Sequence, residues 1–263
     1  MSVVAGSDLL VLWDVDGTLL NAGGVGVELY GLVFRGLFGR APDAFAPMAG
    51  RTDRAIILET LELAGVASPR QWVDPFIAGL TAHAPSMRAA VAARGRVLPG
   101  AAEAIAALAS APANAVSGRP RRVYQSVLTG NIRPVAEVKL AALGLDGPLD
   151  LGIGAYGDDH EVRTELVAVA RRRAAAAHGR VPADFAGRAT VLVGDTPLDI
   201  EAALASGARA VAVATGPFPA ADLRAAGAHA VLPDLTDTAL VLRAVLSLGL
   251  RSRAQHAGEQ GLS

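Results

Sequence analysis

Two hydrophobic patterns divide the chain. Leu9 to Trp13 is a short apolar run that ends at Asp14, which predicts a buried strand followed by a loop. From Pro99 onward, short apolar runs alternate with longer stretches in which apolar residues recur at helical spacing. The runs predict strands at 123–128, 149–154, 190–193, 208–214 and 229–232, and the stretches predict helices at 100–110, 134–143, 161–177, 197–206, 220–226 and 236–248. This alternation predicts an α/β fold with a doubly wound parallel sheet covered on both faces.

Residues 22–95 show the helical pattern alone. Apolar residues at helical spacing predict helices at 25–39, 53–65, 70–80 and 85–95, with proline and glycine between and within them. We therefore expect a core domain formed by residues 1–21 and 96–250, with a small all-helical domain inserted at 22–95. The polar segment 251–263 is expected to be a frayed tail.

The composition is that of a globular protein. The 263 residues are 52% hydrophobic and 19% charged, enough to bury a sizeable core. A net charge of −1 gives no electrostatic reason to expect nucleic acid or an anionic membrane as a partner.

No apolar run approaches the roughly 18 residues of a membrane span, and the first residues lack the basic segment of a signal peptide. The absence of cysteine excludes disulfides, thiolate metal sites and cysteine nucleophiles. We expect a cytoplasmic monomer or homodimer.

Lys139 is the single lysine among 24 basic residues. The abundance of alanine and arginine indicates a coding bias that replaces dispensable lysines by arginine. The lysine ammonium is a compact point charge, whereas the arginine guanidinium is larger and planar. A lysine kept under this bias therefore indicates a position that arginine cannot fill. Chance survival is the alternative.

Polar residues gather just beyond the ends of three predicted strands. They are Asp14 and Asp16, Thr129, and Asp195 and Asp199. Ligands bind beyond the carboxyl ends of parallel strands, so we expect these side chains to form one site. Taken singly, each has a plainer explanation, since such an aspartate often caps the next helix and Asp-Gly often forms a turn. Together, four carboxylates would repel each other unless they hold a cation, and hard oxygen ligands suit Mg²⁺.

These segments match a known family. Asp14-Val15-Asp16-Gly17-Thr18, Thr129, Lys139 and Gly194-Asp195-x-x-x-Asp199 resemble the four motifs of the haloacid dehalogenase-like (HAD) hydrolase superfamily. The resemblance extends from Leu9 to near Leu235, and the helical insert is similar to the C1 cap of the phosphoglycolate phosphatase-like branch. It implies a Rossmann-like HAD core with a C1 cap. Dehalogenases of this superfamily lack the acidic residue at the position of Asp16, so the resemblance implies phosphoryl transfer.

The resemblance implies a role for each carboxylate. Asp14 is expected to be the nucleophile that forms an aspartyl-phosphate. Asp16 is expected to protonate the leaving alkoxide and then to deprotonate the attacking water. Mg²⁺ is expected to be held by Asp14, the backbone carbonyl of Asp16 and Asp195, with Asp199 binding it directly or through water.

The other motifs imply residues that hold the substrate. Thr129 and the backbone N–H of Gly130 are expected to hold a phosphoryl oxygen, and Lys139 is expected to bridge the nucleophile and the phosphate. In many relatives the lysine follows the next strand instead, so an arginine such as Arg163 is the alternative to Lys139. The residues expected to bind the substrate are Thr18, Arg51, Gly130 and Asn131.

Within the insert, Gly50-Arg51-Thr52-Asp53 resembles the loop that points at the active site in C1-capped relatives. Arg51 would then clamp a carboxylate or a second phosphate on the substrate. The alternative is that Thr52 and Asp53 simply cap the helix that follows.

These observations predict a Mg²⁺-dependent phosphatase that acts on a small, soluble phosphate monoester, phosphoglycolate being the namesake substrate of the branch. Two alternatives stay open. A phosphomutase of the same fold would return the phosphoryl group to a second position of its substrate. A phospho-accepting signalling module would hold an aspartyl-phosphate without turnover, but it needs neither an acid at Asp16 nor a cap-sized insert.

Overall fold

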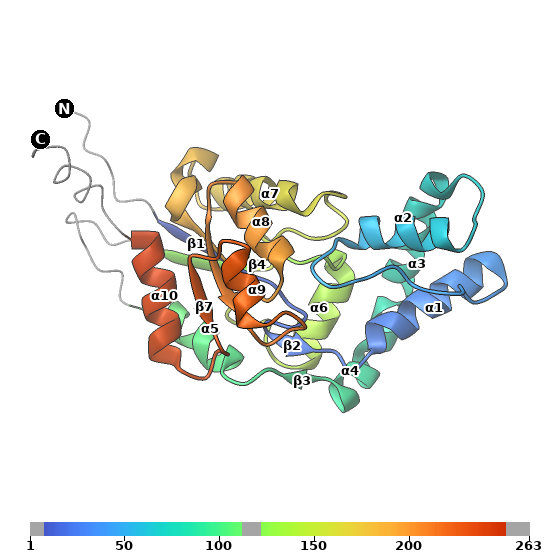
Figure 1. Cartoon of the computed structure of the whole chain (residues 1–263), viewed down its shortest axis with the longest axis horizontal. Helices are drawn as coiled ribbons and strands as arrows, with labels where there is room; N and C mark the ends of the chain where they lie inside the picture. Colours follow the sequence, from blue (N-terminus) through green and yellow to red (C-terminus); the bar gives the residue numbers. More distant parts are fainter. Residues whose placement is uncertain (1–7, 112–121, 251–263) are drawn as a thin grey trace, which may run out of the picture.

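The computed structural model describes residues 8–111 and 122–250. Five parallel strands form one sheet in the order β4-β1-β5-β6-β7, seen in the left half of Figure 1. The strands are β1 (Leu9–Trp13), β4 (Val123–Val127), β5 (Thr190–Gly194), β6 (Arg209–Val213) and β7 (Ala230–Leu232). The predicted doubly wound parallel sheet is confirmed.

Helices cover both faces of this sheet (Figure 1). Side chains of β1 alternate between the faces, with Val11 and Trp13 in the core of one face and Leu10 and Leu12 in the core of the other. The first face is covered by α5 (Ala101–Ala109), α6 (Arg133–Ala142) and α10 (Thr238–Leu250), and the second by α7 (Arg163–Ala177), α8 (Pro197–Ala205) and α9 (Ala220–Ala225). Because β1 is buried on both faces, its sequence is an unbroken apolar run.

A helical insert, which we call the cap, extends to the right of the sheet in Figure 1. The chain leaves the core through β2 (Leu20–Asn21) and returns through β3 (Arg96–Val97), and these two strands pair antiparallel as a two-stranded neck. The cap contains α1 (Val25–Phe38), α2 (Asp53–Leu63), α3 (Val73–His83) and α4 (Arg88–Arg94), with 3₁₀ turns at Pro69–Trp72 and Ala84–Met87. The domain boundaries expected at residues 22 and 95 stay a prediction, and the neck lies beside both.

The cap has a hydrophobic cluster that continues into the core domain. Phe34, Phe76 and Leu80 are fully buried within the cap. The same cluster includes Ile132 and Val135, which lie at the start of α6. The cap therefore packs on the core through apolar side chains as well as through the neck.

The strand predicted at 149–154 is wrong. The carboxylate of Asp150 accepts the N–H of Gly152 (3.0 Å), which closes a turn where a strand would have continued. Asp150 meets the edge of β4 by donating its N–H to the carbonyl of Gln125 (2.9 Å) and accepting the Ser126 hydroxyl at its own carbonyl (2.6 Å), and an isolated bridge between Leu128 and Ala155 follows the turn. The apolar residues of the segment are buried as a turn packed against the sheet edge, a placement that apolar patterning does not distinguish from a strand.

The other predicted helices and strands form, with ends shifted by a few residues. Two 3₁₀ turns, Pro182–Phe185 and Gly187–Ala189, lead into β5. The frayed tail expected at 251–263 lies outside the described residues. Within residues 8–111 and 122–250, no helix combines the length and the apolar character needed to cross a bilayer.

Candidate active site

Three buried aspartates meet at the carboxyl-terminal edge of the sheet. Asp14 directly follows β1, Asp195 directly follows β5, and Asp199 lies in the first turn of α8. One carboxylate oxygen of each lies within 4.8 Å of the others. The three residues are 6%, 1% and 3% exposed, respectively. The strand ends thus bring together groups that are far apart in the sequence.

Arg163, the first residue of α7, brings a positive charge into this cluster. Its Nη2 donates to Asp14 (2.9 Å), to Asp199 and to the carbonyl of Leu128 (3.3 Å). Burial alone would lower the pKa of Arg163, but Asp199 and Asp14 raise it above its ordinary value. Burial raises the pKa of Asp14 to about 7, against the opposing effect of Arg163. One guanidinium shared by two carboxylates does not neutralise the cluster.

The carboxylate of Asp195 fits in a cradle of small residues. Thr18 donates its hydroxyl to Asp195 (2.9 Å). A Cβ atom at Gly17 or Gly216 would come within 2.4 or 1.8 Å of Asp195 Oδ2, so a larger side chain there would displace the carboxylate. Burial and the charges of the two neighbouring aspartates raise the pKa of Asp195 to about 8. Thr18 is fully buried, and in this geometry it holds Asp195 rather than facing the cavity.

The donor set fits a divalent cation. Three buried carboxylates from two chain segments converge, and an oxygen-preferring ion would offset their mutual repulsion. Asp199 already has both oxygens engaged, one by Arg163 and the other by the N–H and hydroxyl of Thr196. Asp14 and Asp195 are therefore better placed than Asp199 to hold such an ion directly.

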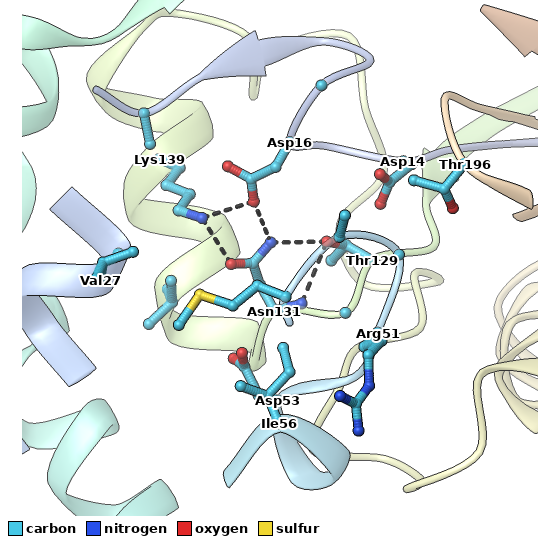
Figure 2. A pocket seen from close by; sticks show the side chains of 18 of the residues that line it. Asp14, Asp16, Val27, Arg51, Asp53, Ile56, Thr129, Asn131, Lys139 and Thr196 are labelled. Atoms are coloured by element: carbon cyan, nitrogen blue, oxygen red, sulfur yellow. Dashed lines mark hydrogen bonds and ion pairs between the residues drawn. The ribbon is translucent and has the colours of Figure 1, made fainter. Parts of the chain in front are cut away.

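Beside the aspartates, Asn131 links Asp16, Thr129 and Lys139 in one network (Figure 2). Lys139 donates to Asp16 (2.6 Å) and to the side-chain oxygen of Asn131 (2.7 Å). The amide nitrogen of Asn131 donates to Asp16 (2.7 Å) and to the Thr129 hydroxyl (2.8 Å). Both candidates for the cationic role thus reach the site. Lys139 pairs with Asp16, whereas the contact to Asp14 expected of a lysine is made by Arg163.

These groups line one side of a cavity of about 320 Å³. The predicted residues that line it are Asp14, Asp16, Arg51, Thr129, Gly130, Asn131, Lys139 and Asp195. Arg51 lines the cavity, but its guanidinium forms an ion pair with Glu59 of the cap (2.6 Å). Thr18 and Asp199 do not line it, and each holds another site residue instead.

The cap loop that precedes α2 rests on the core. Thr52 accepts the N–H of Ala55 (3.3 Å) and so caps α2, as the alternative interpretation of this loop predicted for Thr52, and its hydroxyl also donates to the carbonyl of Glu161 in the core (2.6 Å). A Cβ atom at Gly130 would lie 1.8 Å from the carbonyl of Arg51. Glycine at position 130 is therefore required for this close approach of two backbones.

Asp53 ties the cap to the core. Its N–H donates to the carbonyl of Gly130 (2.7 Å), and its carboxylate accepts the N–H of Ile132 (2.7 Å) and the hydroxyl of Tyr30 (2.6 Å). Burial raises the pKa of Asp53 to about 6, although the hydrogen bonds from Tyr30 and Ile132 act to lower it. This role could not be predicted from the sequence, because an aspartate at the start of a helix has the same local pattern whether it caps the helix or bridges two domains.

We expect Asp53→Ala to lower the free energy of unfolding by about 1–3 kcal/mol, because it leaves the Tyr30 hydroxyl and the Ile132 N–H buried without their acceptor. Urea unfolding measures this change. Asp74→Ala is the matched control, since Asp74 pairs with Arg54 and its side chain is 79% exposed. The control should change the unfolding energy by less than about 1 kcal/mol. Equal losses in both variants would contradict a bridging role for Asp53.

Comparison with protein families gives one match that spans most of the chain. A family model described as haloacid dehalogenase-like hydrolase matches residues 11–204. In a search of curated proteins, none matches the chain.

Solved structures share the fold at low sequence identity. A candidate beta-phosphoglucomutase from Bacteroides vulgatus is 17% identical, covering 95% of this chain and 93% of its own, with a TM-score of 0.59. A candidate phosphatase from Clostridium acetobutylicum is 15% identical over 90% of this chain and 99% of its own, with a TM-score of 0.61. A candidate phosphoglycolate phosphatase from Lactobacillus plantarum is 16% identical over 90% of this chain and 100% of its own, with a TM-score of 0.58. At such identities the likeness establishes the fold alone.

Proposed function

Because the chain belongs to the haloacid dehalogenase-like hydrolases, we propose that it is a Mg²⁺-dependent phosphatase for a small phosphate monoester. The observation that carries this proposal lies at the end of β1. Asp14 belongs to a cluster of three buried carboxylates, and Asp16 lines the same cavity as Asp14. Cleavage of a phosphate ester needs a nucleophile and also an acid for the leaving alcohol, and these two residues supply both.

The reaction has two steps. In the first, a carboxylate oxygen of Asp14 attacks phosphorus, and the new O–P bond forms as the bond to the alcohol oxygen breaks. Asp16 gives its proton to the departing alcohol. In the second, a water molecule attacks the phosphorus of the aspartyl-phosphate while Asp16 takes a proton from that water. Inorganic phosphate leaves, and Asp14 is restored as a carboxylate.

Asn131 prepares the groups that hold the phosphate. Because Asn131 donates to the oxygen of Thr129, the hydroxyl proton of Thr129 is free to donate to a phosphoryl oxygen. Lys139 places its ammonium group on the side-chain oxygen of Asn131 and on Asp16, so it brings a positive charge to the same cavity and holds Asp16. Mg²⁺ held by Asp14, Asp195 and the backbone carbonyl of Asp16 would offset the repulsion between the nucleophile and the phosphate. The cap would exclude bulk water, so that the positioned water reaches the intermediate.

The proposal is tested by phosphate release from a panel of phosphate esters, with Mg²⁺ and with EDTA. We expect release in Mg²⁺ and none above background in EDTA. Asp195→Asn should need at least about tenfold more Mg²⁺, because asparagine keeps the size of the side chain but removes the charge that binds the ion. Asp222→Asn, exposed on α9, is the control and should behave as the wild type.

Two results would contradict the proposal. Full activity in EDTA would exclude a metal-dependent mechanism. If no ester of the panel releases phosphate but an aspartyl-phosphate can be trapped on the protein, the result would favour a phosphomutase or a phospho-accepting module.

A further inference from the structure

The cavity has two chemically different ends. The core end carries the charged groups Asp14, Asp16 and Lys139. The cap end carries the apolar side chains of Val27, Leu29, Met48 and Ile56. Tyr30, Asp53 and Arg51 also line it, but their polar groups are already paired within the protein. In Figure 2, Val27 from α1 and Ile56 from α2 lie on the cap side of the network around Asn131. A phosphate bound at the core end would direct its alcohol toward these apolar side chains.

Val27 leaves apolar surface uncovered at this end. It is 44% exposed, whereas Leu29 and Tyr30, next to it on α1, are each 5% exposed. The residue before it, Gly26, also faces open space, since a Cβ atom there would meet nothing closer than Lys139 Nζ at 3.8 Å. Apolar surface of this kind gains stability when a ligand removes it from water.

The positively charged side chains that line the cavity already have partners. Lys139 pairs with Asp16, and Arg163 pairs with Asp14 and Asp199. Both lie at the core end, where the phosphate would bind. In the described part of the chain, Arg51 is the cationic residue that the cap contributes to the cavity lining.

Arg51 is held by the cap itself. Its guanidinium pairs with Glu59 (2.6 Å) and donates to the carbonyls of Pro47 (3.2 Å) and Ala55 (3.5 Å). Figure 2 shows this side chain directed away from Asp14 and Asp16. A carboxylate or second phosphate at the cap end would have to break these contacts or stay unpaired, and an unpaired charge removed from water is costly.

We infer that the alcohol half of the substrate is uncharged and apolar, a short alkyl or aryl group, and that phosphoglycolate and sugar bisphosphates are poor substrates. This inference rests on the proposed phosphatase function. It assigns the charged end of the cavity to the phosphate, and Val27 and its apolar neighbours to the alcohol. Arg51 is then a structural residue of the cap loop.

Two esters of nearly equal shape test the inference. Both are phosphate esters of a CH₂ group, which carries an uncharged isopropyl group in isobutyl phosphate and a carboxylate in phosphoglycolate. We expect kcat/KM for isobutyl phosphate to exceed that for phosphoglycolate by at least about tenfold. Val27→Arg should narrow or reverse this ratio by placing a cation at the cap end. Leu32→Arg is the matched control, because Leu32 is 42% exposed on the same helix and does not line the cavity, and it should leave the ratio unchanged.

The opposite preference would overturn the inference. If phosphoglycolate is the better substrate and Arg51→Ala removes that preference, Arg51 leaves Glu59 to bind the carboxylate. Equal kcat/KM values for the two esters would also overturn it. Acetyl phosphate is a small activated substrate that does not need the apolar end of the cavity. Its hydrolysis therefore tests the phosphatase function separately from the preference for one alcohol. Hydrolysis of acetyl phosphate that depends on Asp14 keeps the phosphatase proposal, and its absence overturns both.

Discussion

Asp14→Asn is expected to abolish phosphate release, with a loss of at least about 10⁴-fold in kcat. Asparagine fits the same space, but its amide is not a nucleophile that can form the aspartyl-phosphate. The change also removes one of three buried like charges, while Arg163 keeps Asp199 and the carbonyl of Leu128 as acceptors. The thermal midpoint should therefore equal or exceed that of the wild type. Phosphate release and thermal unfolding measure the two effects separately.

Asp8 gives the control for this variant, because it lies at the opposite end of β1 and its carboxylate is also buried. It accepts hydrogen bonds from Arg180 (2.7 Å) and from the N–H of Arg122 (3.0 Å). Asp8→Asn should lower stability and leave kcat unchanged. Wild-type turnover by a folded Asp14→Asn protein would show that another residue is the nucleophile.

Lys139→Ala is expected to lower kcat by about 10²–10³-fold, since it removes the charge beside the phosphate and a donor to Asp16. Lys139→Arg should not restore the rate. The ammonium contacts Asp16 and Asn131 within 2.7 Å, and the residue is only 5% exposed. The larger, planar guanidinium of arginine would not fit in this buried space between the two side chains. Steady-state kinetics on the folded variants measure both effects.

Arg163 is the comparison for Lys139, because it is the cation that touches Asp14. Arg163→Ala leaves buried carboxylates without their partner, so its main effect should be a loss of about 3–5 kcal/mol in unfolding free energy. Arg163→Gln keeps more of the packing and provides a folded protein for kinetics. If this variant loses the rate and Lys139→Ala keeps it, then the arginine fills the catalytic role predicted for Lys139.

The central strands could be predicted because burial on both faces leaves a strong apolar signal. β1 contains no charged residue, and neither does β5. The segment 149–154 also repeats apolar residues, but it contains Asp150 and two glycines, and the Asp150 carboxylate accepts the N–H of Gly152 to close a turn. The neck strands are two residues long and pair with a distant segment, so no local pattern predicts them.

The candidate site was predictable where it depends on local features of the chain. Asp14 and Asp195 could be found because they follow apolar runs, and Lys139 because it is the single lysine. Arg163 was proposed only as an alternative, and its position at the start of a helix does not mark it, because Arg88 and Arg133 also begin helices. Its contact with Asp14 depends on how α7 packs against the end of β1. The ion pair between Arg51 and Glu59 likewise depends on how the cap loop folds back, so no local pattern predicts it.

The neck has a consequence for how proteins of this kind diversify. Leu20 lies opposite Val97 and Asn21 opposite Arg96, so the segment between them begins and ends at neighbouring points in space. A different segment joined at the same two points leaves the strand order of the sheet intact. It would need apolar groups to cover Ile132 and a donor for the carbonyl of Gly130. Under the proposed function, exchange of one continuous stretch of gene would change which alcohol is recognised and leave the residues of the phosphoryl chemistry in place.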